Sequence, residues 1–153
     1  MDAKTYALWL LNRRSYPEVK LRFKLKERGF AEMAIASVLK NFKERGYIND
    51  LEYAKSFIRE RCRLRPRAAR VLALELRKRG ISRGDIETAL EDAETMSDEK
   101  ELIRRLVGKK KKQYAKLDDR IARQRLLGYL ARRGFSLSNI KEVLDESAKA
   151  ETD

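Results

Sequence analysis

The chain has 153 residues, with 37 Lys or Arg against 24 Asp or Glu, so its formal charge at pH 7 is +13. It contains no histidine and one cysteine, which excludes His-dependent catalysis, an intrachain disulfide and a multi-thiolate zinc site. Only 7 Gly and 2 Pro stand among many Lys, Arg, Glu, Leu and Ala residues, a composition typical of long helices. The charge favours an anionic partner, and a solvated basic face is the simpler alternative.

The first third of the chain predicts three helices. The first covers residues 4–13, where apolar residues recur on one face. A capping box at residues 15–18, with a proline inside it, opens the second helix. Gly29 ends that helix in the left-handed conformation, and Ile35 and Leu39, four residues apart, mark the buried face of the third.

The middle third predicts the same arrangement. A helix covers residues 51–63, and Asn49 caps its first turn. Pro66 opens the next helix, which ends at Gly80. Ser82 caps the third helix of this group.

The last third predicts three more helices. The first runs from residue 99 to about residue 112, and Asp118 or Asp119 caps the second. Gly134 ends the second helix, and Ser136 caps the third. The tight segment 45–50 predicts a rigid joint between the first two groups, whereas the acidic segment 91–99 predicts a short hinge before the last.

These three groups are copies of one another. Six positions match without a gap when the copies are anchored on Gly29, Gly80 and Gly134, which stand 51 and 54 residues apart. The matched sets are Leu21, Leu72 and Leu126; Leu25, Leu76 and Leu130; Arg28, Arg79 and Arg133; Phe30, Ile81 and Phe135; Ile35, Ile86 and Ile140; and Leu39, Leu90 and Leu144. We therefore predict an all-α protein, an elongated array of three tandem three-helix repeats that resemble helix-turn-helix units. The expected boundaries are residues 1–48, 49–97 and 98–148, with a frayed tail at 149–153.

One stretch of the sequence resembles a known family. Gly46-Tyr47-Ile48-Asn49-Asp50 is followed by Tyr53-Ala54 and, later, by Arg-Lys-Arg-Gly-Ile at residues 77–81. This order is similar to that of the bacterial RecX family, and the resemblance covers about residues 5–145. It implies a regulator without catalysis or cofactor that lies in the groove of RecA filaments on single-stranded DNA. Such a regulator opposes filament growth and lowers RecA's ATP hydrolysis, strand exchange and co-protease function.

The basic segments are the candidate contacts with RecA or DNA, because arginine can form bidentate hydrogen bonds with phosphate and carboxylate groups. The candidates are Arg59, Arg63, Arg67, Arg70, Arg77, Lys78, Arg104, Arg105, Lys109, Lys110, Lys111, Lys112, Arg125 and Arg132. A solvated face is the alternative for each, and the run of four lysines also suits a helix C-terminus. We expect a cytoplasmic monomer with weak direct DNA binding, no metal and no membrane segment.

Other residues leave two interpretations open. The repeated arginine before each glycine is explained by its place at the negative end of a helix, and partner contact is the alternative. Tyr6, Trp9 and Tyr16 fit helix packing better than stacking on bases. Cys62, near many arginines, is either a thiol of lowered pKa or a small helical residue. Two other functions compete: a tandem helix-turn-helix DNA-binding module that acts without RecA, and a helical adaptor for an acidic protein.

Overall fold

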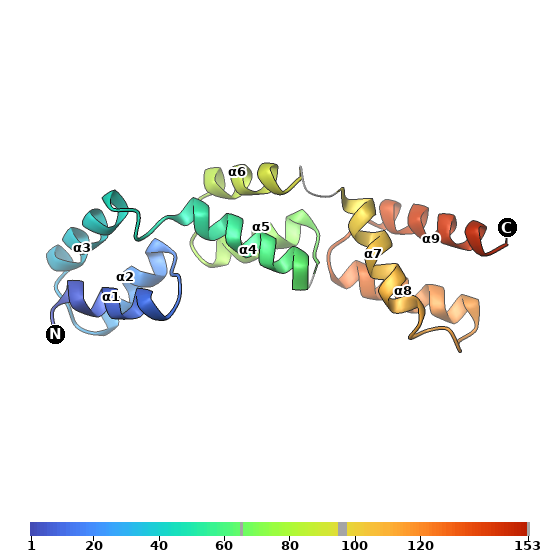
Figure 1. The fold of residues 1–153 in the computed structure, drawn as a ribbon, viewed down its shortest axis with the longest axis horizontal. Helices are drawn as coiled ribbons and strands as arrows, with labels where there is room; N and C mark the ends of the chain where they lie inside the picture. The colour runs from blue at the N-terminus through green and yellow to red at the C-terminus, as the bar shows by residue number, and fades with distance from the viewer. Residues whose placement is uncertain (65, 95–97, 153) are drawn as a thin grey trace. The chain divides into compact units, whose positions relative to one another are not determined.

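The computed structural model describes residues 1–64, 66–94 and 98–152, and these residues form helices and no strand (Figure 1). The described residues form nine helices: α1 (Ala3–Arg13), α2 (Glu18–Glu27), α3 (Glu32–Glu44), α4 (Asp50–Leu64), α5 (Ala69–Lys78), α6 (Arg83–Glu94), α7 (Glu99–Lys111), α8 (Asp119–Arg132) and α9 (Leu137–Thr152). The all-α prediction and the three tandem three-helix repeats are confirmed. We call α1–α3 repeat 1, α4–α6 repeat 2 and α7–α9 repeat 3.

The chain divides into two compact units. The first contains residues 1–58 and 73–91, and the second contains residues 59–72 and 92–153. Helices α4 and α5 therefore each begin in one unit and end in the other. Residues 95–97 of the predicted hinge lie outside the described residues, and so does the last residue of the predicted tail. Residues 149–152 of that tail continue helix α9.

The glycine turns between the second and third helices form as predicted. Gly29, Gly80 and Gly134 have φ of +92°, +88° and +87°, the left-handed region that glycine enters without a Cβ penalty. In each repeat the residue after the glycine donates its N–H to a matched leucine carbonyl: Phe30 to Leu25 at 3.3 Å, Ile81 to Leu76 at 3.2 Å, and Phe135 to Leu130 at 3.4 Å. The repeated Leu-x4-apolar spacing thus encodes a Schellman C-cap.

Three predicted helix caps are confirmed. The Oδ1 atom of Asn49 accepts the Glu52 N–H at 3.1 Å at the start of α4. The Ser82 hydroxyl accepts the Asp85 N–H at 3.2 Å before α6, and the Ser136 hydroxyl accepts the N–H of Asn139 at 3.3 Å before α9. Asp118 precedes α8 but its side chain makes no capping hydrogen bond.

The capping box predicted at residues 15–18 is wrong. Helix α2 begins at Glu18 with Pro17 before it, and no side chain of that segment caps it. The Glu18 N–H donates instead to Oδ1 of Asp50, the first residue of α4, at 2.9 Å. The start of α2 is therefore capped by the next repeat, 32 residues away.

The prediction that Pro66 opens a helix is also wrong. Helix α5 begins at Ala69, and residues 66–68 are not helical. Their backbone groups contact repeat 3: the Ala68 N–H donates to the Arg133 carbonyl at 3.1 Å, and the Pro66 carbonyl accepts from Nη1 of Arg133 at 3.3 Å. In a helix opened by Pro66, the Pro66 carbonyl would accept a hydrogen bond within the first turn, whereas here it accepts one from Arg133.

Candidate functional site

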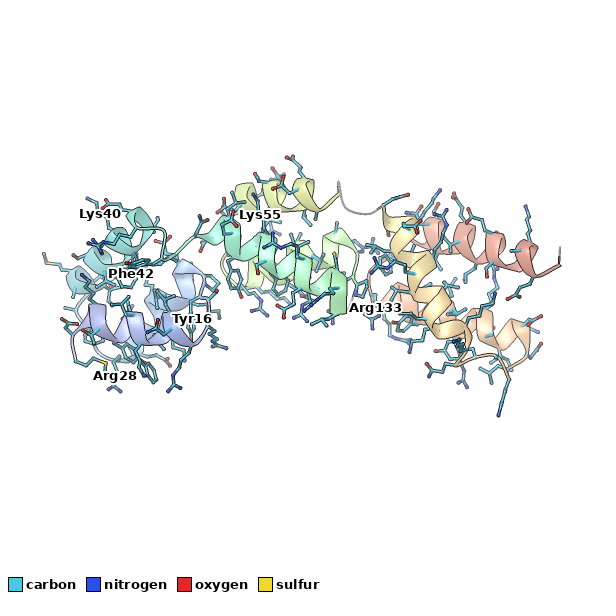
Figure 2. All side chains as sticks on the ribbon, viewed as in Figure 1. Tyr16, Arg28, Lys40, Phe42, Lys55 and Arg133 are labelled. Atoms are coloured by element: carbon cyan, nitrogen blue, oxygen red, sulfur yellow. The ribbon has the colours of Figure 1, made fainter. Side chains whose placement is uncertain are left out.

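The repeated arginines before the glycines, two of which are labelled in Figure 2, stack on aromatic rings. The guanidinium carbons of Arg28 and Arg79 lie 5.2 Å and 4.8 Å from the ring centroids of Tyr6 and Phe57, respectively. These two aromatic residues occupy the same position, 23 residues before the glycine of each repeat. In repeat 3 the same role falls to Tyr129, 4.6 Å from the guanidinium of its arginine. Cation–π contact inside each repeat therefore supports the structural interpretation of these arginines.

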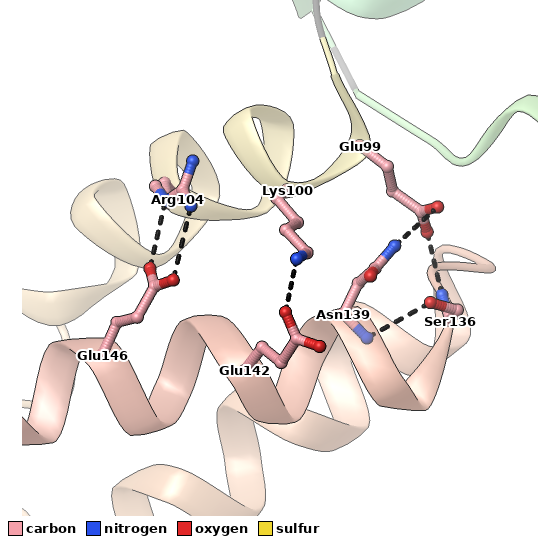
Figure 3. A network of polar contacts seen from close by, with 7 residues as sticks. All are labelled: Glu99, Lys100, Arg104, Ser136, Asn139, Glu142 and Glu146. Atoms are coloured by element: carbon pink, nitrogen blue, oxygen red, sulfur yellow. Dashed lines mark hydrogen bonds and ion pairs between the residues drawn. The ribbon is translucent and has the colours of Figure 1, made fainter.

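Arg104 faces α9 and not solvent alone (Figure 3). Its Nε atom donates to Glu146 at 3.2 Å, and Nη1 donates to Glu101 at the same distance. Lys100 pairs with Glu142 one turn earlier on the same two helices. The hydrogen bonds of Arg104 with Glu146 and, next, with Glu101 raise the pKa of its guanidinium.

Glu99 extends this row of contacts at the start of α9. Its Oε1 atom accepts the Ser136 N–H at 2.9 Å, and its Oε2 atom accepts from the Asn139 amide at 3.1 Å. The first turn of α7 thus satisfies the first turn of α9. The row fixes α7 against α9 by polar contacts, so Arg104 is occupied within repeat 3.

Three other candidates are also occupied or partly buried. The Arg70 guanidinium donates to the Phe135 carbonyl at 3.3 Å, and Arg105 donates to the Cys62 carbonyl at 3.4 Å. Arg67 lies before α5 and is half-buried, so it is not on the helix that the sequence predicts after Pro66.

Two lysines of the predicted run make contacts within repeat 3. Lys110 donates to the Gln113 side chain at 3.2 Å and lies 4.7 Å from the ring of Tyr129. Lys111 forms an ion pair with Glu151 on α9. The lysine run is therefore not a uniform solvated cluster.

The other candidates are exposed, and their side chains make no hydrogen bond or ion pair with the described part of the chain. They are Arg59, Arg63, Arg77, Lys78, Lys109, Lys112, Arg125 and Arg132. Arg125 and Arg132 lie seven residues apart on one face of α8, as the spacing predicts. These side chains are available to an external anion without the loss of an internal partner.

Within the second compact unit, one hydrogen bond links α7 to the end of α4, and exposed cations stand one turn away on each helix. Arg59, Cys62 and Arg63 share one face of α4, because they are separated by three and four residues. Arg105 of α7 reaches the carbonyl of that cysteine, and Lys109 follows Arg105 by one turn. We call Arg59, Arg63, Arg105 and Lys109 the α4–α7 cluster.

The cysteine in this cluster does not behave as the lowered-pKa alternative requires. Burial raises the pKa of the Cys62 thiol, and the nearby Arg105 charge opposes this effect without reversing it. The thiol is half-buried. The interpretation as a small helical residue fits these surroundings better than a reactive thiolate.

The aromatic residues of α1 and of the segment after it are only partly a packing feature. Tyr6 and Tyr16 pack against the repeat 1 core. Trp9 is 42% exposed, stacks on Tyr6 at 5.8 Å between centroids, and lies 4.0 Å below the Arg13 guanidinium. The prediction of packing holds for the two tyrosines and fails for the tryptophan.

Two further features of the described residues bear on function. In the described ranges, no three Cys, Asp or Glu side chains gather as a group suited to a metal ion. No helix in that part of the chain is long and apolar enough to cross a membrane.

The structure also contains a groove in repeat 3 that the sequence analysis did not predict, and Ser147 is one of its lining residues. The signal for this groove in the sequence is the serine itself, which stands at the position where repeat 1 has Phe42.

Three consecutive three-helix repeats, each with a glycine turn between its second and third helices, define a tandem helical-repeat protein. Sequence comparison gives the family. The descriptions "RecX, first three-helix domain", "second three-helix domain" and "third three-helix domain" match residues 3–41, 49–90 and 98–144, respectively. The chain belongs to the RecX family.

Individual relatives agree with this assignment. The chain is 37% identical over 144 residues to a "Regulatory protein RecX" of Caldanaerobacter subterraneus, covering 94% of this chain and 70% of the relative. It is 32% identical to one of Chlorobium phaeobacteroides, covering 95% of this chain and 94% of the relative. A crystal structure titled "regulatory protein RecX" superposes with a TM-score of 0.77 at 26% identity, covering 94% of this chain and 71% of that one. RecX from Lactobacillus salivarius shares the fold, with a TM-score of 0.79 at 23% identity over 94% and 93% of the two chains.

Proposed function

We propose that this protein binds RecA filaments on single-stranded DNA, opposes their growth and lowers RecA's ATPase, strand exchange and co-protease activities. It acts by binding and not by catalysis, as a monomer in the cytoplasm. Membership of a family of regulatory proteins supports the partner. The observation that supports the contact surface is the hydrogen bond from Arg105 to the Cys62 carbonyl, which links α7 to the end of α4 that carries the exposed Arg59 and Arg63.

Exposed cations without partners are the natural contact residues. A side chain already paired with a carboxylate must lose that partner before it binds an external anion, and this loss offsets the gain. Arg59 and Arg63 have no such partner among the described residues, whereas Arg104 is held by two glutamates. Arginine also binds phosphate and carboxylate with two parallel hydrogen bonds, which adds orientation to attraction.

The same reasoning narrows the predicted surface. Replacing Arg70 would remove a hydrogen bond to the Phe135 carbonyl as well as a charge, so a loss of function would have two causes. Replacing Arg59 and Arg63 removes only exposed charge. These two residues therefore provide the cleaner test of the proposed surface.

The experiment is a titration of this protein into RecA's single-stranded-DNA-dependent ATP hydrolysis at about 150 mM salt. The wild type should inhibit, and the R59E/R63E variant should need at least about tenfold more protein, equivalent to about 1.4 kcal/mol. The matched control is K20E/K26E, which makes the same charge change at exposed lysines of α2. That control should inhibit like the wild type.

Each outcome bears on a different part of the proposal. Equal losses in the two double variants would mean that total charge and not the α4–α7 cluster determines binding. No loss in either would move the contact to another surface. A wild type that binds bare duplex DNA but leaves RecA's ATPase unchanged would contradict the proposed function and favour the independent DNA-binding module.

A further inference from the structure

The third helices of repeats 1 and 3 have the same buried face except at one position. Counted from the glycine turn, the buried residues of α3 and α9 correspond in order. They are Ile35 and Ile140, Val38 and Val143, and Leu39 and Leu144. The next member of the row is Phe42 in repeat 1 and Ser147 in repeat 3. An aromatic side chain is thus replaced by a hydroxymethyl group.

In repeat 1 this end of the core is closed. Phe42 is fully buried, and Figure 2 shows it inside the three-helix group. After α3 the chain turns at Gly46 and returns, so that Ile48, which is 4% exposed, joins the same core. The aromatic ring and the returning isoleucine are both buried in the repeat 1 core.

In repeat 3 neither covering element is present among the described residues. Helix α9 continues through Thr152 without a glycine turn, and Ser147 leaves the place of the phenylalanine ring unfilled. The result is a groove of about 820 Å³ between the end of α7, the start of α8 and the last turns of α9. Its walls include Val107, Leu126 and Leu144, which belong to the repeat 3 core.

The α7–α8 side of the groove is basic, whereas the α9 side, residues 144–151, contains Asp145, Glu146 and Glu151 against one lysine. Residues 109–126, which form two of its three sides, contain eight Lys or Arg and two Asp, a net charge of +6. Two of these cations are partly neutralised, since Lys111 pairs with Glu151 and Arg123 donates to Asp145 at 2.8 Å. Arg120, also a lining residue, has no hydrogen bond or ion pair within the described ranges. An apolar floor with excess positive charge along its α7–α8 side suits an apolar side chain carried by an acidic segment that follows that side.

We propose that this groove is a docking site for a large apolar side chain, of the size and shape of phenylalanine, on an acidic segment of the protein partner. The inference rests on the proposed function, in which that partner is the RecA filament. Repeat 1 supplies the template for the occupant, because its own phenylalanine fills the corresponding place. A buried apolar anchor with charged residues around it is the usual composition of a binding hot spot.

The test fills the groove from within. The S147F variant places a phenylalanine where repeat 1 has one, so it should raise Tm by about 2–4 °C. The same variant should weaken binding to RecA filaments on single-stranded DNA at least about tenfold, measured by co-sedimentation with the full chain. Two controls accompany it: S147A leaves the groove open, and S138F adds a phenylalanine at an exposed position near the start of α9. Both should bind like the wild type.

A rise in stability together with a loss of binding separates groove filling from misfolding. Equal filament affinity of S147F and wild type would overturn the docking site while leaving the proposed function intact. A wild type that fails to bind filaments would overturn the proposed function and this inference together. An equal loss on bare single-stranded DNA would mean that the groove holds a base and not a protein side chain, which also contradicts the proposal.

Discussion

The approach of Gly134 to α5 provides the sharpest test of how repeat 3 packs against the preceding segment. Its φ is +87°, and a Cβ atom built on it would lie 2.1 Å from Cγ2 of Val71 and 3.6 Å from Cβ of Ala68. Carbon atoms in contact normally stand about 3.5–4.0 Å apart, so the turn or the valine must move in a G134A variant. Two costs therefore add: backbone strain and overpacking.

Gly29 separates these two costs. It has nearly the same φ, +92°, but nothing lies within 4 Å of its Cβ position. The G29A variant should therefore lose only the backbone contribution, about 1–2 kcal/mol of unfolding free energy. Overpacking adds about 1–3 kcal/mol, so G134A should lose about 2–5 kcal/mol in total.

Urea unfolding followed by far-UV circular dichroism measures both variants, with the slope m checked for a change in cooperativity. In a V71A background the Gly134→Ala change should cost no more than Gly29→Ala does in the wild type, because the clashing methyl group is absent. Equal losses for G29A and G134A in the wild-type background would refute the close approach. So would an unchanged cost of G134A after the valine is truncated.

Three further predictions follow from other contacts. Replacing Asp50 by alanine should cost about 1 kcal/mol, because the Glu18 N–H loses its acceptor. Burial, the largest effect, raises the pKa of the Asp50 carboxyl above 3.8, so ionisation of this group opposes folding as pH rises through the folded pKa. The D50N variant keeps the acceptor oxygen and removes the charge, so thermal unfolding should show that it matches or exceeds wild-type stability at pH 7. At pH 3 the difference in stability should vanish. Cys62 should react with a disulfide reagent at pH 8 more slowly than a free cysteine, and more slowly still in R105Q, because burial raises its pKa and the arginine lowers it. The F42S variant, which opens in repeat 1 the groove that repeat 3 has, should lose about 3–5 kcal/mol by urea unfolding; a loss under 1 kcal/mol would contradict the role of Phe42 in closing that core.

The repeat architecture could be predicted because its signals are local. A glycine at φ near +90° and two leucines one and two turns before it specify a helix end and a buried face within nine residues. Ser82, Ser136 and Asn49 cap helices three residues ahead, so their partners are also set by spacing. Such local features form independently of the contacts that a repeat makes with its neighbour.

The features that were missed depend on residues far away in the chain. The first turn of α2 looks like a capping box in sequence, but a carboxylate 32 residues later competes successfully for the Glu18 N–H. Pro66 looks like a helix opener, but its carbonyl serves Arg133, 67 residues away. In both places the local sequence preference did not determine the structure, because a residue distant in the chain forms the hydrogen bond with the backbone group concerned.

The candidate site illustrates why charge counts alone overestimate a binding surface. Arg70, Arg104 and Arg105 belong to the basic segments, yet each donates to an acceptor inside the protein. Arginine suits both tasks, since its planar group stacks on rings and bonds to carbonyls as readily as to phosphate. Sequence shows where the arginines are, and only the fold separates those that hold repeats together from those left for a partner. The exposed pair Arg59 and Arg63 is therefore a narrower and more testable proposal for the contact surface than the full basic composition.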